Sequence, residues 1–418
     1  MQRNSTLQNI DWITVILYLL LVGMGWMNIY SASLSDSAVS FTDLGNIYAK
    51  QLFFIGLSLV LIVFILAVEA KFYERFSSVI YLLALASLLG LFVFGKDING
   101  AKSWYSFGAF GLQPSEFAKA ATALALSKYL SDIQTNVRLF NHQLKAFLII
   151  ILPALFIIPQ PDPGSALIFT ALIFPLYREG LSFIYLLLGF IVAFLFVATL
   201  LIGAYWVAAG VAAIAVVLWI KNRKKRRNLG KYVIITGACV AFAFSVSYIF
   251  NNVFEQRHRD RFNIVLGKEV DTRGIGYNTN QSEIAIGSGG FWGKGWTKGT
   301  QTKGNFVPEQ HTDYIFSTVG EEWGFLGSII VVILFLWLII RLLILAERQK
   351  QQFARVYGYS LAAILFFHFF VNIGMVTGLF PTVGIPLPFF SYGGSALWGF
   401  TILLFIFVKL DSSNFINR

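Results

Sequence analysis

The chain has 418 residues, of which 57% are hydrophobic and only 13% are charged, and its mean hydropathy is +0.70. Soluble domains carry roughly 25% charged residues, so the composition excludes an ordinary soluble domain and indicates a surface that largely faces lipid. The net charge of +11 is better explained by basic loops at one membrane face than by nucleic acid binding. A single cysteine, Cys239, excludes an intrachain disulfide, and the four histidines form no metal-binding pair.

Apolar runs along the chain predict an all-α polytopic membrane protein with about 10–12 transmembrane helices, because a spanning helix needs about 20 apolar residues. The two runs beside the proline-rich stretch 157–165 are short, which predicts a tight hairpin there. One of the closely spaced pair after it could be re-entrant. The first run is longer than a signal-peptide core, so we expect it to be retained. The runs are 12–30, 50–68, 77–95, 115–131, 146–160, 164–179, 182–203, 205–220, 231–250, 325–345, 355–377 and 386–409.

Lysine and arginine residues gather in alternate short loops, most densely in "KNRKKRR" at 221–227. Because cytoplasmic loops carry such residues, this pattern places both termini in the cytoplasm. We interpret 221–227 as a topology anchor, with a specific lipid or protein site as the alternative.

The polar stretch 251–312 then falls outside the membrane as one large extracytoplasmic loop. Its length is unusual for a connection, and its aromatic and apolar residues predict an ordered structure. The glycine cluster "GSGGFWGKG" at 287–295 is not a phosphate-binding Walker A loop, because Gly295 follows Lys294. It is either a turn-rich loop packed on the membrane face or a nest of backbone amides for a pyrophosphate.

A second polar island, 100–120, precedes the fourth apolar run. Pro114 suits the first turn of a helix, and Glu116 suits its positive end. Lys119 lies one turn after Glu116 on the same face, inside an apolar run, so it either faces a cavity with a partner or snorkels to the interface. Trp104 is either an interfacial belt residue or a ligand contact.

The stretch "PEQHTDYIF", 308–316, places Asp313 where a polar loop meets an apolar run. A structural explanation is helix capping, because Asp and Thr are favoured at helix N-termini, and "TVGE" at 318–321 offers a capping box as well. The functional explanation is that Asp313 is a proton acceptor at the mouth of the membrane.

Glu309 and His311 support the functional explanation, because they bring three titratable groups within five residues. We expect the fold to bring Lys119 close to Asp313 and keep the carboxylate ionised. Two unit charges at 4 Å interact by about 4 kcal/mol at an effective dielectric constant of 20. The proline-rich stretch 379–396 predicts a broken helix that lines a cavity or acts as a hinge.

Several stretches together resemble one family. "YSAS" follows the first span, "GAKSW" and "QPSEFAK" flank the fourth, and "QPDPGSAL" follows the fifth. Later come "GYNTNQSEIAIGSGGFWGKG", "PEQHTDYIFSTVGEEWGFLG" and "NIGMVTGLFPTVGIPLPFFSYGGSA". The combination runs nearly end to end and resembles the SEDS (shape, elongation, division and sporulation) membrane proteins. "IAIGSGG…GKG…GTQ" and the short N-terminus are more similar to the rod-shape-determining, RodA-type branch than to the division branch.

This resemblance implies a peptidoglycan glycosyltransferase that polymerises lipid II at the outer face of the bacterial cytoplasmic membrane. It also implies that Asp313 is the essential residue, and that Trp104 and Lys119 belong to the family's motifs. The implied partner is a class B penicillin-binding protein, which is a transpeptidase.

The sequence departs from the family pattern at four places. Thr272 stands where proline is common, Asn305 where glutamate is common, and Pro163 where leucine is common. The family usually has ten spans, so residues 182–250 are expected to hold an extra helical hairpin.

The implied chemistry joins an α-linked sugar pyrophosphate into a β-1,4 glycan, which is one inverting displacement and requires one base. Asp313 would accept the proton of the acceptor hydroxyl. The pyrophosphate leaving group needs cations, supplied by Lys119, by Arg273 or by a divalent cation such as Mg²⁺ or Mn²⁺. Glu116, Glu309 and His311 are further candidates for substrate binding, and no residue is predicted to ligate a resident metal.

Two other functions remain open from the sequence. A lipid II flippase would need polar residues through the bilayer depth on several helices, whereas here they concentrate at the outer face. A scaffold that only recruits the transpeptidase would tolerate the loss of Asp313.

Overall fold

The computed structural model describes residues 9–34, 41, 43–98, 101–108, 110–222, 229–254, 256–268 and 276–413. These residues form two compact units. The main unit comprises the chain up to Leu181 and from Asn278 onward, and the second unit runs from Ser182 to Tyr277.

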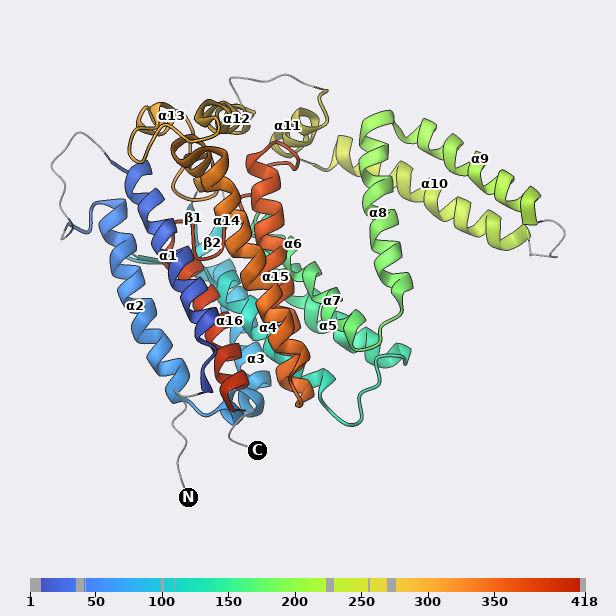
Figure 1. The fold of residues 1–418 in the computed structure, drawn as a ribbon. Coiled ribbons are helices and arrows are strands. Elements are labelled where there is room, and N and C mark those ends of the chain that lie inside the picture. Colours follow the sequence, from blue (N-terminus) through green and yellow to red (C-terminus); the bar gives the residue numbers. More distant parts are fainter. Residues whose placement is uncertain are drawn as a thin grey trace. The chain divides into compact units, whose positions relative to one another are not determined.

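The main unit is helical except for one small sheet (Figure 1). Its elements are α1 (Trp12–Ala32), α2 (Ile47–Ala67), α3 (Ala70–Phe94), β1 (Lys96–Ile98), β2 (Ala101–Phe107), β3 (Phe110–Leu112), α4 (Pro114–Leu130), α5 (Phe140–Ile157), α6 (Pro163–Ile168), the 3₁₀ helix η2 (Phe169–Leu172), α7 (Ile173–Arg178), α12 (Tyr277–Gly289), α13 (Thr300–Lys303), α14 (Ile315–Glu347), α15 (Gln352–Val376) and α16 (Gly394–Ser413).

The second unit contains α8 (Phe183–Ile202), α9 (Ala204–Asn222), α10 (Leu229–Asn252) and α11 (Gln256–Val265). Both closely spaced runs are continuous helices long enough to cross a membrane, which favours two full spans over a re-entrant segment. That this hairpin is additional to the family's usual spans stays a prediction.

Ten of the described helices are long and apolar enough to span a membrane, so the predicted all-α polytopic class is confirmed. They are α1, α2, α3, α5, α8, α9, α10, α14, α15 and α16. Of the other two predicted runs, 115–131 forms the shorter α4. The run at 164–179 is divided among α6, η2 and α7, which the sequence analysis did not predict.

Helix α4 lies at the centre of the main unit, packed against α3, α5, α15 and α16. Its sequence is rich in alanine, and small side chains let neighbouring helices approach closely. On α16, Gly399 allows the same approach, because a Cβ there would lie 3.0 Å from the backbone oxygen of Glu116. Pro114 occupies the first turn of α4, as predicted.

The polar island before α4 forms a three-stranded antiparallel sheet in the order β1–β2–β3, which the sequence analysis did not predict. The hydroxyl of Tyr105 on β2 donates to the backbone oxygen of Ser87 on α3 at 2.7 Å. This bond holds the sheet against the end of a spanning helix.

Three ion pairs lie at the end of the main unit where the chain begins and ends. Both ends of the described chain, Asn9 and Ser413, lie at the end opposite α12 and α13 (Figure 1). At the terminal end, Arg341 pairs with Asp11, Arg348 pairs with Asp411 and Arg355 pairs with Glu179. Three arginines of the main unit, each paired with a carboxylate, therefore lie at the end that the sequence analysis predicts to be cytoplasmic.

The glycine cluster at 287–295 packs against a kink in α14. The amides of Lys294 and Gly295 donate to the carbonyls of Glu321 and Glu322 at 3.0 and 2.9 Å, and the amide of Phe325 donates to Gly290 at 2.9 Å. These bonds pack the stretch onto α14, which favours the packed-loop alternative, and the pyrophosphate nest stays a prediction.

The kink itself falls at Gly324, whose φ is +64°. A Cβ at this position would lie 2.3 Å from the amide nitrogen of Gly293, so only glycine fits both the backbone conformation and the space.

We predict that Gly324→Ala destabilises the protein, because the substitution adds left-handed strain of about 1–2 kcal/mol and a backbone clash. The measurement is the midpoint of thermal unfolding of the purified protein in detergent. Gly56→Ala is the matched control, since nothing lies within 4 Å of a Cβ there. Equal midpoints for the two variants would contradict the prediction.

Candidate active site

The loop that carries Asp313 is fastened to the non-helical segment 379–393, which separates α15 from α16. Asn372, fully buried on α15, joins the two. Its amide donates to the backbone oxygens of both Asp313 and Ile385, each at 2.7 Å. One side chain thus fixes the position of Asp313 relative to the segment.

Three more contacts reinforce this junction. The hydroxyl of Ser391 donates to the backbone oxygen of Thr312 at 2.7 Å, and the amide of Tyr392 donates to that of His311 at 2.9 Å. The rings of His311 and Tyr392 meet edge to face, 5.6 Å apart. The predicted last span begins at Gly394 and not at 386 because the backbone of 379–393 is committed to these contacts.

Asp313 is half-buried and lies just before α14. The N-cap position of α14 is Tyr314, whose side chain makes no capping hydrogen bond, so Asp313 lies one residue before the predicted capping position. The carboxylate faces Gly384, at which a Cβ would lie 3.4 Å from Oδ2 of Asp313. The glycine leaves the space beside the carboxylate free of a side chain.

The predicted capping box at 318–321 is wrong. Because α14 begins at Ile315, Thr318 lies inside the helix, and its buried hydroxyl has no hydrogen-bond partner among the described residues. Glu321 instead accepts hydrogen bonds from the amides of Gln301 and Thr302 and pairs with Lys294 at 2.8 Å. This carboxylate anchors the loop around α13 to α14.

Lys119 is buried and lies in a cluster formed by α4, α15 and α16. Its ammonium contacts both carboxylate oxygens of Glu116 at 2.8 Å and Nε2 of His368 at 2.9 Å, and it lies 4.7 Å from the ring centre of Phe400. All three N–H donors of the Lys119 ammonium are therefore used within the protein. The predicted pairing with Glu116 is present, whereas contact of Lys119 with Asp313 or with substrate stays a prediction.

His368 is a residue that the sequence analysis missed. Its Nδ1 lies 3.2 Å from the backbone oxygen of Pro386, which only accepts, so Nδ1 carries the proton and Nε2 accepts from Lys119. The imidazole links the Lys119 cluster to the same segment that holds Asp313. A histidine inside an apolar run was the available signal, because titratable groups within spans are rare and conspicuous.

The "QPDPGS" stretch, residues 160–165, also packs against the segment 379–393. A Cβ at Gly164 would lie 2.3 Å from the backbone oxygen of Val383. Asp162 accepts from the side-chain amide of Gln113 at 3.0 Å and caps α6. The segment 379–393 thus contacts α6, α15 and the loop before α14.

Trp104 is half-buried on β2 and packs over Gly111 on β3, where a Cβ would lie 3.0 Å from its ring. The backbone oxygen of Gly111 accepts from Ser395 at the start of α16. The structure therefore connects the sheet to α16, and the predicted contact of Trp104 with a ligand stays a prediction.

The remaining predicted residues are distributed differently. Glu309 is exposed, has a φ of +55° and accepts from the hydroxyl of Thr312 at 2.9 Å. Arg273 lies outside the described residues. Within the described ranges, no three His, Cys, Asp or Glu side chains gather in a way that could hold a metal ion.

Burial lowers the pKa of His311 below its ordinary value, and the nearby carboxylate of Glu309 partly offsets this effect. The imidazole is therefore neutral at physiological pH. Burial likewise raises the pKa of its neighbour Tyr392, which stays protonated.

Comparison with known proteins identifies the family. Residues 11–226 and 207–415 match the sequence profile of the FtsW, RodA and SpoVE cell cycle proteins. The chain belongs to this family. The SEDS resemblance is thereby confirmed.

Two relatives match this SEDS protein almost end to end. Peptidoglycan glycosyltransferase MrdB of Escherichia coli (strain K12) is 34% identical over 390 residues, which cover 93% of this chain and 90% of the relative. Peptidoglycan glycosyltransferase RodA of Treponema pallidum (strain Nichols) is 31% identical over 425 residues, with coverage of 95% and 96%.

A solved structure shares the SEDS fold. A chain from a peptidoglycan synthase complex that coordinates polymerization and crosslinking superimposes with a TM-score of 0.70 at 24% identity, covering 97% of this chain and 98% of that one. The multi-pass fold described here is therefore the fold of the family.

We predict that Asn372→Ala lowers the midpoint of thermal unfolding, because it removes two hydrogen bonds to backbone carbonyls, each worth about 0.5–1.5 kcal/mol. Asn252→Ala is the control, since its amide makes one exposed bond to Tyr248. A midpoint for Asn372→Ala that equals the control value would refute the bridging role.

The lowered pKa of His311 predicts a pH dependence of stability. Between the lowered folded value and about 6.5, the unfolded chain binds a proton that the folded chain does not, so stability falls as pH falls through this window. His311→Gln should flatten the decline of the unfolding midpoint between about pH 7 and 5. Equal declines for the wild type and His311→Gln would contradict the prediction.

Proposed function

We propose that this SEDS protein is a RodA-type peptidoglycan glycosyltransferase that polymerises lipid II into β-1,4 glycan strands during cell elongation. The activity is supported by relatives of that name which match nearly the whole chain. The branch is supported by the names MrdB and RodA on those relatives and by the glycine-rich motif at 284–301.

The observation that carries the proposal is the placement of Asp313. A half-buried carboxylate lies at the start of a spanning helix, opposite a glycine, on a loop that Asn372 and Ser391 hold in place. A base must be positioned to within a fraction of an ångström to be effective, and these contacts supply that rigidity.

In the proposed mechanism, Asp313 accepts the proton of the acceptor sugar's 4-hydroxyl as that oxygen attacks the anomeric carbon of the donor. The bond from this carbon to the pyrophosphate oxygen breaks, and undecaprenyl pyrophosphate leaves with the electron pair. A single displacement inverts the α-linkage to β and needs no general acid, because pyrophosphate is already a stable anion.

The cations that stabilise the leaving group belong to the proposal as well. Arg273 is a candidate, and a divalent cation such as Mg²⁺ or Mn²⁺ could bind with the pyrophosphate of the substrate. With the contacts that the structure shows, Lys119 would be a positioning residue. It would hold Glu116 and His368 in place, and through His368 the segment beside Asp313. Trp104, Glu116, Glu309 and His311 remain proposed substrate-binding residues.

We place the site at the outer face of the bacterial cytoplasmic membrane. Asp313, α12 and α13 lie at the end of the main unit opposite the described termini and the Arg341 and Arg348 ion pairs. Since basic residues favour the cytoplasm, both termini are assigned to the cytoplasm and Asp313 to the outside. The sugar of a lipid-linked substrate lies in the headgroup layer there.

A class B penicillin-binding protein is the proposed partner. A transpeptidase would crosslink the glycan as it forms. The shared fold with a chain from a complex that coordinates polymerization and crosslinking is consistent with this pairing.

The decisive experiment compares the wild type with Asp313→Asn in a polymerisation assay with lipid II and a divalent cation. The assay is run with and without the transpeptidase partner. We expect the substitution to reduce polymer formation by about 10²–10⁴-fold, since it removes a positioned base. Asp132→Asn, in an exposed loop that links α4 to α5, should retain wild-type activity.

Equal polymer from the wild type and from a folded Asp313→Asn variant would show that the base is another residue. No polymer from either protein, even with the partner present, would favour a lipid II flippase or a scaffold.

A further inference from the structure

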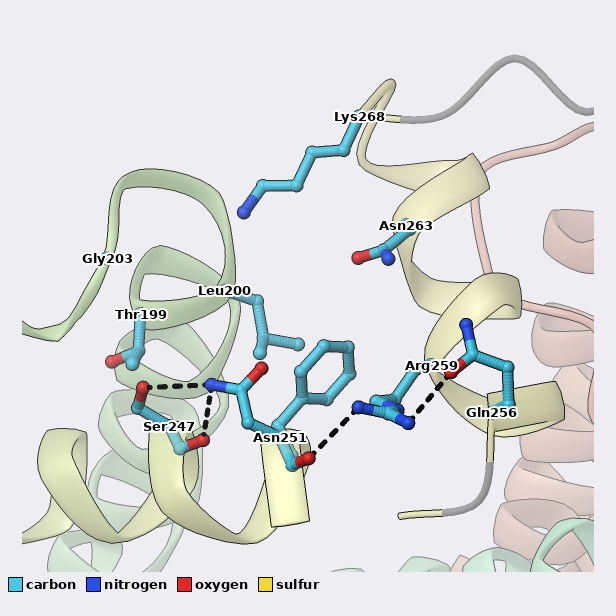
Figure 2. A pocket seen from close by; sticks show the side chains of 10 residues that line it. Thr199, Leu200, Gly203, Ser247, Asn251, Gln256, Arg259, Asn263 and Lys268 are labelled. Carbon is cyan, nitrogen blue, oxygen red and sulfur yellow. Dashed lines mark hydrogen bonds between the residues drawn. The ribbon is translucent and has the colours of Figure 1, made fainter.

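The second unit contains a polar cavity that the glycosyltransferase chemistry does not use. Its volume is about 460 Å³, and it lies between the ends of α8 and α10 and the helix α11 (Figure 2). The lining residues are Thr199, Leu200, Gly203, Ser247, Phe250, Asn251, Gln256, Arg259, Asn263 and Lys268.

Aromatic packing builds the wall of this cavity. Phe262 of α11 meets Phe196 of α8 and Phe250 of α10 edge to face, at ring distances of 5.6 and 6.1 Å. Leu200 and Phe250 belong to the same buried cluster. Helix α11 is therefore packed onto α8 and α10, and the cavity is a defined concavity within the unit.

The charge of the lining is one-sided. Arg259 and Lys268 contribute two cations, and no carboxylate of the described residues lines the cavity. The nearby Asp260 accepts from the side chain of Gln256 and is not among the lining residues. Figure 2 shows Lys268 extending from the end of α11 toward α8.

Two buried polar atoms of the lining have no hydrogen-bond partner among the residues described: Oγ1 of Thr199 and Nε of Arg259. Thr199 is only 3% exposed. Buried polar groups are almost always hydrogen-bonded, so orphaned groups beside a cavity indicate a bound polar group.

Arg259 also has a structural task, because its Nη1 donates to the backbone oxygen of Asn251 at 2.9 Å and its Nη2 to Gln256 at 2.7 Å. This caps the end of α10, as a cation does at many helix C-termini. Capping explains neither Nε of Arg259 nor the hydroxyl of Thr199.

The depth of the cavity identifies the ligand class. Helices α8 and α10 have 20 and 24 residues, which corresponds to about 30 and 36 Å at 1.5 Å per residue. The hydrocarbon core is about 30 Å thick, so a cavity in the last turns of both helices lies at the headgroup layer. The anionic group that the anionic phospholipids of that layer share is a phosphate.

We propose that this cavity binds a phosphate group, held by Lys268, Arg259 and Thr199. The phosphate belongs to the headgroup of an anionic membrane lipid or is free in solution. Charge-assisted hydrogen bonds from the two cations would bind the oxygens, and the hydroxyl of Thr199 would gain its missing partner.

The test uses the full chain, purified in detergent, and native mass spectrometry with three probes. These are dioleoyl phosphatidylglycerol, dioleoylglycerol, which lacks the phosphate, and inorganic phosphate as a competitor. We expect retention of phosphatidylglycerol and not of dioleoylglycerol. Competition by inorganic phosphate would assign recognition to the phosphate alone, whereas retention without competition would assign it to the lipid headgroup.

Lys268→Gln and Thr199→Val should each weaken this retention, the former by roughly tenfold for the loss of one charge-assisted bond. The matched controls are Lys231→Gln and Thr236→Val, which make the same changes on α10 away from the cavity and should bind as the wild type does. Equal binding by all four variants, or equal retention of dioleoylglycerol, would overturn the proposal.

Discussion

The arrangement of the main unit depends on how the non-helical segment 379–393 finds hydrogen-bond partners for its backbone N–H and C=O groups inside a membrane protein. A non-helical backbone at this depth is tolerated only where protein or a water-filled cavity supplies hydrogen-bond partners. Asn372 and His368, both on α15, donate hydrogen bonds to two backbone carbonyls of the segment. Ser391 and Tyr392, within the segment, donate to backbone carbonyls of the loop before α14. The same bonds that make the break tolerable determine where Asp313 stands.

This arrangement unites motifs that are far apart in the chain. The buried cluster of Glu116, Lys119 and His368 contacts the segment through the bond between His368 and Pro386. Gly164 of α6 packs against the segment as well. Burial of an ion pair contributes little stability by itself, because desolvation opposes the attraction. Its value here is geometric, since it fixes α4 and α15 to one another beside the segment.

How much could be predicted from the sequence varies with the range of the interaction. Hydropathy predicted the spanning helices, and the i, i+3 spacing predicted the pairing of Glu116 with Lys119, because both are local properties. The partnership of Lys119 with His368 joins residues 249 positions apart and has no local signature. The small sheet was missed because its strands are short, and the capping box failed because α14 begins three residues before Thr318. Asp313 was singled out by its place at a membrane mouth and by family resemblance, whereas the role of Asn372 emerged only from the fold.

The hydrogen bonds of Asn372 also have a consequence for biosynthesis. The loop that carries Asp313 is translated before α15, and the segment that completes its support is translated only just before α16. Domains emerge from the ribosome with their N-terminal parts first. The loop therefore enters the membrane environment without Asn372, Ser391 or Tyr392 to hold it. The mouth around Asp313 is among the last parts of the main unit to assemble, and a chain cut short before the segment 379–393 would insert most of its helices without a formed site.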